Sequence, residues 1–214
     1  MKRRSIGLFI CAILLLSSVP ALANPQKTEQ GKVECYKSSF YGMKEINEKA
    51  LSYEKLDVLD KRLAGILNSD DGINKKMNET LNILKNASIL PENFDSHFLS
   101  LLRKEWGWGI LNYVISYGKG EIYIPLKSDR SFLRLLLRPI FFKYNIGFTM
   151  TKFGATYIWD RSNVVGNMGF MLGRQRGFMV GFIGLHVRIP HKLNPDSHLF
   201  IGAAIMINGN NLLF

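Results

Sequence analysis

The sequence contains little cysteine, little proline and no long hydrophobic run. Only two of its 214 residues are cysteines, which excludes a framework of several disulfides. The longest apolar run, residues 6–16, covers about half of the ~20 residues that a membrane-spanning helix needs. Charged residues are 21% and aromatic residues 12% of the chain, which excludes a disordered or collagen-like protein. The length suffices for one ordinary domain with a hydrophobic core.

Motifs that carry chemistry are also scarce. His186, His191 and His198 lie within thirteen residues, but their spacings match no standard ligand pattern and no cysteine joins them. We therefore expect solvated loop histidines, with no metal and no cofactor. Asp196, Ser197 and His198 are the residue types of a hydrolase triad, but consecutive residues cannot converge in that geometry. The sequence favours a non-enzymatic role.

The N-terminus has the pattern of an export signal. Three positively charged residues at positions 2–4 precede the apolar run, and an A-x-A site follows at residues 21–23. This pattern resembles a bacterial Sec-type signal peptide comprising residues 1–23, which predicts a protein of the periplasm or outer membrane. Cleavage after Ala23 would lower the formal net charge from +11 to +8 and leave Cys35 as the single cysteine. Cys35 is then either a free thiol or paired with another chain.

The chain divides into two parts of different composition near residue 105. Residues 24–104 carry 13 basic and 12 acidic side chains, whereas residues 105–214 carry 12 basic and only 5 acidic ones. Of the 19 glycines, 14 follow residue 104. Nucleic acid is not expected as a partner of this basic part, because the chain is predicted to be exported and shows no binding motif.

Residues 39–104 are predicted to be a helical segment, preceded by a flexible tail at residues 24–38. Apolar residues recur there at intervals of three and four, as one face of an amphipathic helix requires. The positions that indicate the first helix are Met43, Ile46, Ala50, Tyr53, Leu56, Leu59, Leu63 and Ile66. A second helix is indicated by Ile73, Met77, Leu81 and Leu84, and Pro91 begins a third.

Residues 105–214 are predicted to be an antiparallel β domain. From Ile140 to Met150 the apolar residues alternate with other residues, with the period of two that is typical of a half-buried strand. Several shorter segments repeat this pattern, and a turn is predicted at residues 173–177. No long crossover connection separates the segments, which favours antiparallel pairing.

The expected fold class is α+β, with N-terminal helices followed by a glycine-rich antiparallel sheet. Glycines inside strands are typical of sharply bent sheets, so the sheet is expected to be curled or closed as a small β-barrel. The barrel could be soluble or inserted in the outer membrane. Its terminal Phe214 resembles the assembly signal of bacterial outer-membrane barrels, whereas the short strands and the helical segment favour a soluble form.

Basic residues cluster at two places in the β domain. Arg130, Arg134 and Arg138 recur every four residues, and Arg174 and Arg176 lie in the predicted turn. These five side chains form the candidate anion site, which is expected to bind lipid phosphates or headgroups. The alternative is that they are ordinary solubility charges or protect apolar strands from aggregation.

The sequence thus predicts an exported cell-envelope protein with a structural or binding role. Its partner would be anionic lipid or another envelope protein. One alternative is a small outer-membrane enzyme acting on lipid, with His186, Asp160 and a nearby hydroxyl inside a barrel. Another is a carrier of an apolar ligand, which needs a large cavity between sheet and helices.

Overall fold

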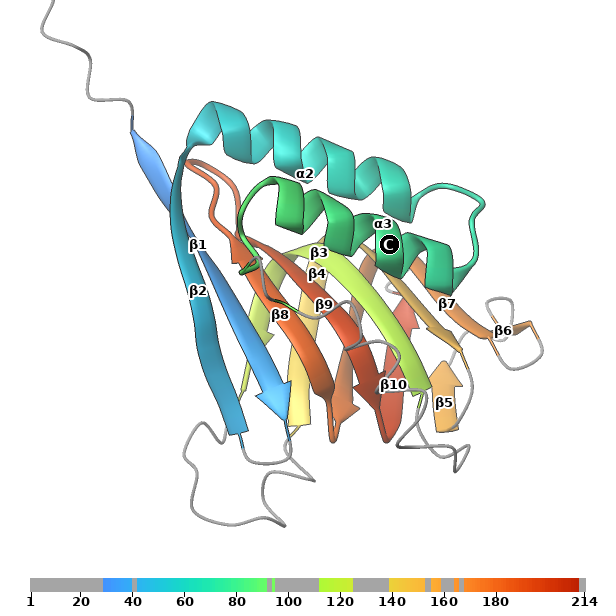
Figure 1. Ribbon diagram of the computed structural model, residues 1–214. Helices are drawn as coiled ribbons and strands as arrows, with labels where there is room; N and C mark the ends of the chain where they lie inside the picture. Colours follow the sequence, from blue (N-terminus) through green and yellow to red (C-terminus); the bar gives the residue numbers. More distant parts are fainter. Residues whose placement is uncertain are drawn as a thin grey trace, which may run out of the picture.

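The computed structural model describes residues 29–39, 42–91, 94, 112–124, 139–152, 155–158, 164–165 and 168–211. Within them ten strands form one sheet, and two helices lie across one face of it (Figure 1). The helices are α2 (Tyr53–Leu67) and α3 (Ile73–Asn86). The strands are β1 (Gln30–Ser39), β2 (Gly42–Ser52), β3 (Asn112–Tyr123), β4 (Pro139–Lys152), β5 (Ala155–Ile158), β6 (Val164–Val165), β7 (Met168–Val180), β8 (Ile183–Ile189), β9 (Ser197–Ala204) and β10 (Met206–Asn211).

The sheet is open. Its strands follow the order β2-β1-β8-β9-β3-β4-β7-β10-β5, and β6 pairs with β7. All neighbours are antiparallel except β10 and β5, which are parallel. Among the described residues the two end strands, β2 and β5, do not pair with each other, so the expectation of a closed barrel is wrong. The glycines that suggested closure instead make room for close contacts within the sheet.

The expectation of N-terminal helices followed by a separate sheet is also wrong. Gln30–Ser39 and Gly42–Ser52 are strands, so the sheet begins where a tail and a helix were expected, and both helices lie between its second and third strands. Ile46 has no partner in the β1–β2 register, because the pairing shifts between Cys35 and Tyr36. The apolar residues Met43, Ile46 and Ala50 are spaced by three and four, which resembles a helix, but pairing with β1 makes this segment a strand.

The helices begin and end where local chemistry satisfies their backbone. The Ser52 hydroxyl accepts a hydrogen bond from the backbone N–H of Lys55 and caps the start of α2. At the other end of α2 the ammonium of Lys76, from α3, donates to the carbonyls of Leu67 and Ser69. The same ammonium lies 4.7 Å from the ring centroid of Phe148 on β4, so one buried cation connects both helices to the sheet.

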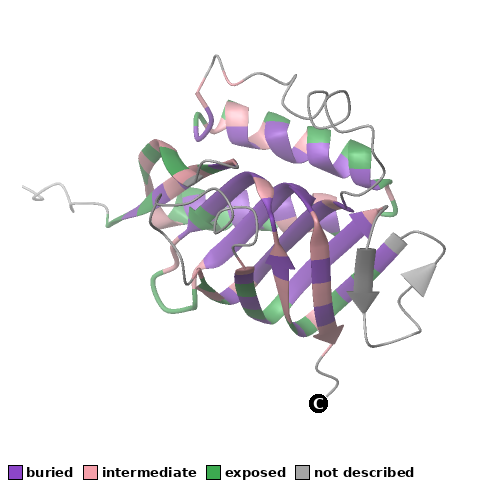
Figure 2. Cartoon of the chain, turned by 90° about the horizontal axis from the view of Figure 1, so that it is seen from below, coloured by how far each residue is buried: buried purple, intermediate pink, exposed green. Residues whose placement is uncertain are grey.

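Each face of the sheet has its own cluster of buried hydrophobic residues, and the buried positions are purple in Figure 2. The face under the helices, here called the helix face, packs Leu56, Leu63 and Leu84 against strand residues such as Val187 and Ile201. The opposite face has its own cluster, drawn from β3, β4, β7, β9 and β10. Its members are Val114, Ile140, Phe142, Tyr144, Met171, Met179, Phe182, Phe200, Ala204 and Ile207.

A β-bulge in β4 changes the face of the sheet to which its even-numbered side chains point. Tyr144 pairs with Gln175 and Gly147 pairs with Gly173, so Asn145 and Ile146 together oppose only Arg174. Before the bulge the even-numbered residues face the opposite side, whereas Phe148 and Met150, after it, pack under the helices. The strand itself is confirmed, but its apolar residues do not share one face as the alternation predicted.

Gly118 and Tyr144 show what the glycines do in the sheet. A Cβ atom at Gly118 would lie 2.3 Å from Cγ of the Tyr144 ring, so only glycine leaves room for the ring over β3. The Tyr144 hydroxyl then lies 3.2 Å from the Ser116 hydroxyl. From Ser116 a chain of hydrogen bonds runs through the Thr149 hydroxyl to the buried side chain of Gln175. The close approach therefore gives the buried phenol a polar partner.

Candidate functional site

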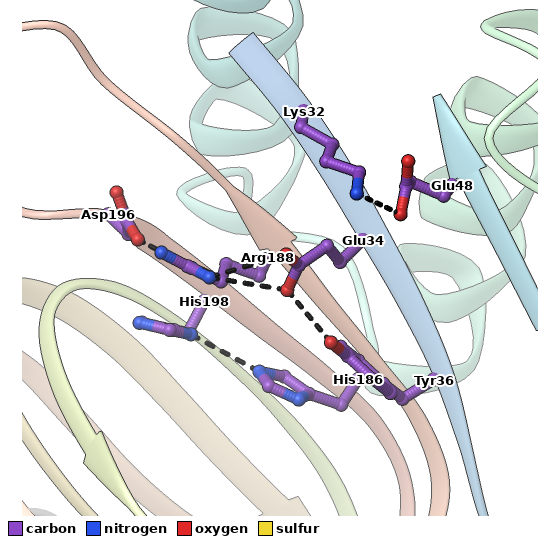
Figure 3. A network of polar contacts seen from close by, with 8 residues as sticks. All are labelled: Lys32, Glu34, Tyr36, Glu48, His186, Arg188, Asp196 and His198. Carbon is purple, nitrogen blue, oxygen red and sulfur yellow. Dashed lines mark hydrogen bonds and ion pairs between the residues drawn. The ribbon is translucent and has the colours of Figure 1, made fainter. Parts of the chain in front are cut away.

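A pair of buried histidines lies on the opposite face of the sheet (Figure 3). Nε2 of His186 on β8 lies 3.2 Å from Nδ1 of His198 on β9. The His186 ring also stacks on Phe200, with centroids 4.3 Å apart, and on Tyr36. Both side chains are buried, so the expectation of solvated histidines is wrong for these two. Burial lowers the pKa of His198 to about 4, so its ring is uncharged at neutral pH.

The charged side chains beside the histidines balance one another (Figure 3). Nε of Arg188 donates to Asp196 at 2.6 Å, which raises the pKa of the guanidinium, and its Nη1 lies 3.3 Å from Glu34. Glu34 also accepts the Tyr36 hydroxyl at 2.8 Å, and burial together with this bond raises the pKa of Tyr36 to about 12. Because two carboxylates already neutralise Arg188, this network does not favour an anion.

A cavity of about 430 Å³ lies beside the histidine pair. Glu34, Tyr36 and His186 contribute to its wall, together with the apolar side chains of Met43 and Ile122. In the part of the chain that the structure describes, no group of three or more His, Cys, Asp or Glu residues is placed to hold a metal ion.

A second polar cluster lies between α2 and the helix face. Asp60 accepts hydrogen bonds from the hydroxyls of Ser197, at 2.7 Å, and Tyr117, and it pairs with the ammonium of Lys119 at 2.7 Å. Nε2 of His191 lies 2.8 Å from the Ser197 hydroxyl. Ser197 is fully buried. The cluster therefore ties α2 to β3 and β9, and it does not present its serine to a substrate.

Part of the helix face extends beyond the helices, over β3, β4 and β7 (Figure 1). Of the seven exposed large hydrophobic side chains among the described residues, five lie there; the other two are Val58 and Leu193. Ile146 is 71% and Leu172 54% exposed. Between these apolar residues lie three exposed cations. We call this surface the uncovered face; it consists of Tyr123, Phe141, Lys143, Ile146, Phe170, Leu172, Arg174 and Arg176.

Two rows of directly opposed residues cross one end of the uncovered face, over β3, β4, β7 and β10. The aromatic row is Tyr123, Phe141, Phe178 and Asn208. The charged row is Glu121, Lys143, Arg176 and Asn210. In the aromatic row the ring centroids are 6.3 Å and 5.8 Å apart. All eight residues line a cleft of about 750 Å³, in which an aromatic strip lies beside two cations.

The two cations of the charged row are direct neighbours. Lys143 pairs with Arg176 in the β4–β7 register, and both side chains are exposed. Among the described residues neither forms an ion pair. Like charges directly opposite each other destabilise a sheet, and Glu121, the register partner of Lys143 on β3, offsets part of that cost in the same row.

The structure places part of the predicted anion site on this surface. Arg174 and Arg176 lie on β7, which runs through the predicted turn. Gly173, with φ +88°, forms part of the bulge there, and the chain turns instead near Gly181. The predicted site residues Arg130, Arg134 and Arg138 lie outside the described residues. Lys143 was missed, although its position between Phe142 and Tyr144 in an alternating strand indicates the face opposite those two buried rings.

No protein-family model, no curated protein and no solved structure matches this chain. Over the described residues, no helix is both long enough and apolar enough to cross a membrane.

Proposed function

We propose that this chain is an exported, non-enzymatic protein of the bacterial cell envelope that binds anionic lipid through its uncovered face. The observation that carries the proposal is the gathering of five exposed large hydrophobic side chains and three cations on one face of the sheet. The predicted signal peptide and the positive charge of the mature chain support the same conclusion.

The apolar part of the face is suited to the membrane interface. Tyr123 and Phe141 lie at one end of it, and Ile146 and Leu172 lie at the other. Contiguous exposed apolar surface on a soluble protein usually marks an interaction site, and aromatic rings favour the headgroup level of a bilayer. We expect these side chains to enter the interface without crossing the hydrocarbon core.

The cations of the uncovered face favour a lipid with a negatively charged headgroup. Lys143 lies on β4, and Arg174 and Arg176 lie on the adjacent strand β7. The charged row contains one acid, Glu121. Each basic residue near an anionic bilayer contributes about 1 kcal/mol, which corresponds to about a fivefold change in partitioning. Three of them are enough to make binding depend on the lipid charge and on salt.

The enzyme alternative has less support in the described residues. His186 contacts His198, Tyr36 and Phe200, and Asp160, the acid it would need, lies outside the described residues. Ser197 contacts both a histidine, His191, and an acid, Asp60, but it is buried under α2.

Vesicle sedimentation tests the proposal. The mature protein should be retained on vesicles that contain phosphatidylglycerol, and retention should fall on phosphatidylcholine alone and at high salt. The variant K143Q/R174Q/R176Q should lower the partition coefficient by about a hundredfold. The control variant K55Q/K61Q/R62Q removes three exposed charges from α2 and should retain most of the binding.

Two results would contradict the proposal. One is equal loss of retention in both triple variants, which would indicate a response to net charge alone. The other is the absence of retention on any vesicle, which would leave another envelope protein as the partner of the uncovered face.

A further inference from the structure

At one end of the uncovered face, the cleft formed by the two rows is a more specific feature than the surface around it. We infer that this cleft binds one phosphorylated headgroup, with the phosphate between Lys143 and Arg176 and the adjoining apolar part of the same molecule on the aromatic row. This inference rests on the proposed function, because it identifies the class of lipid that the face selects.

The charged row fits a phosphate group. Lys143 and Arg176 project from the same face of adjacent strands at directly opposed positions, so both can approach one anion. A phosphate carries up to two negative charges and several acceptor oxygens, which suits two neighbouring cations better than a single carboxylate does. Asn210, the register partner of Arg176, places an amide at the same level of the cleft.

The aromatic row fits the part of the ligand next to the phosphate. Phe141 and Phe178 are register partners with ring centroids 5.8 Å apart, and the same pairs of strands carry the charged row. A ligand that holds its phosphate at Lys143 therefore places its next atoms against these rings. A free phosphate ion would use only half of the cleft. The structure thus favours a phosphorylated amphiphile over inorganic phosphate.

A comparison of Arg174 with Arg176 distinguishes headgroup binding in the cleft from general attraction of anions to a charged surface. It lies on the same strand and face as Arg176, and it is exposed, but it does not line the cleft. If the cleft binds the headgroup, Arg176 and Arg174 must differ in their effect on a soluble ligand. If the face attracts anions diffusely, they must have similar effects.

Titration calorimetry with monomeric dihexanoyl phosphatidic acid tests the inference on the mature chain, away from any bilayer. We expect binding that dihexanoylglycerol, which lacks the phosphate, does not show, and weaker binding of inorganic phosphate. R176Q and K143Q should each weaken the affinity about tenfold. R174Q should change it by less than about twofold, and K143R should keep most of it.

The outcomes separate this inference from the proposed function. Equal effects of R174Q and R176Q, or no binding of the short-chain lipid while vesicle retention persists, would overturn the inference and leave lipid docking intact. Binding of inorganic phosphate as tight as that of the lipid would remove the role of the aromatic row. Binding of the soluble lipid without vesicle retention would support the cleft and contradict docking on a bilayer.

Discussion

The carboxylate of Asp60 on α2 lies 2.7 Å from the ammonium of Lys119 on β3, and it is the acceptor around which helix and sheet are joined. Burial alone would raise the pKa of Asp60, but Lys119 and the hydroxyls of Tyr117 and Ser197 outweigh it and lower the pKa below its ordinary value. The ionised form is therefore the one that stabilises the fold.

Replacing Asp60 should destabilise the protein. D60N leaves Lys119 without its counter-ion and should lower the free energy of unfolding by about 2 kcal/mol. This is less than the roughly 3–5 kcal/mol for a fully buried pair, because Lys119 is partly exposed. D57N, on the same helix, removes an exposed carboxylate and should have little effect. Urea denaturation measures both; equal effects of the two variants would contradict the structural role of Asp60.

The same carboxylate predicts a dependence of stability on pH. The pKa of Asp60 is lower in the folded than in the unfolded chain, so its contribution is complete above the ordinary value of about 3.9. That contribution is lost as the pH falls through the lower folded-state pKa. Acid titration of the unfolding free energy should therefore show a smaller decline in D60N than in the wild type. A parallel decline in the two proteins would disprove the assignment.

Gly118 should not tolerate a larger residue. G118A places a Cβ atom 2.3 Å from Cγ of Tyr144 and should cost about 1–3 kcal/mol of unfolding free energy. In G65A, on α2, the added Cβ atom meets nothing within 4 Å and should stabilise the helix by about 0.5–1 kcal/mol. Thermal unfolding of the two variants should therefore shift in opposite directions. A stabilised G118A would mean that the Tyr144 ring does not lie over β3.

The strand β4 shows how much of the fold follows from local pattern. The alternation from Ile140 to Met150 correctly predicts an extended segment, because a period of two suits only a strand. The bulge at Asn145 and Ile146 is not visible in that pattern, since it depends on pairing with β3 and β7. The exposed position of Ile146, and with it part of the uncovered face, therefore could not be predicted from the sequence.

The first strand was missed for a different reason. Val33 and Cys35 are buried and alternate with Lys32 and Glu34, so the signal of a strand is present in the sequence. The alternating segment is short, and it closely follows the predicted cleavage site, where a flexible tail is the usual expectation. The apolar spacing in β2 resembles that of a helix, and the pairing with β1 makes the segment a strand. The error in β2 therefore arises from tertiary pairing that a local pattern does not contain, whereas the error in β1 does not.

Cys35 should be unreactive in the folded protein. The thiol is fully buried on β1, and burial raises its pKa to about 12, so almost no thiolate forms at neutral pH. Labelling with a thiol reagent should be negligible in buffer and complete in guanidinium chloride. Rapid labelling of the native protein, or a disulfide-linked dimer, would contradict the position of Cys35 in the core.

The most direct test of lipid binding by the uncovered face uses this protection of Cys35. An environment-sensitive fluorophore is attached to L172C, on the uncovered face, or to L193C, in the loop between β8 and β9. On addition of vesicles containing phosphatidylglycerol, emission from residue 172 should shift to shorter wavelength, whereas emission from residue 193 should not change. A shift at residue 193 alone, or at neither position while the protein sediments with the vesicles, would show that another surface binds the lipid.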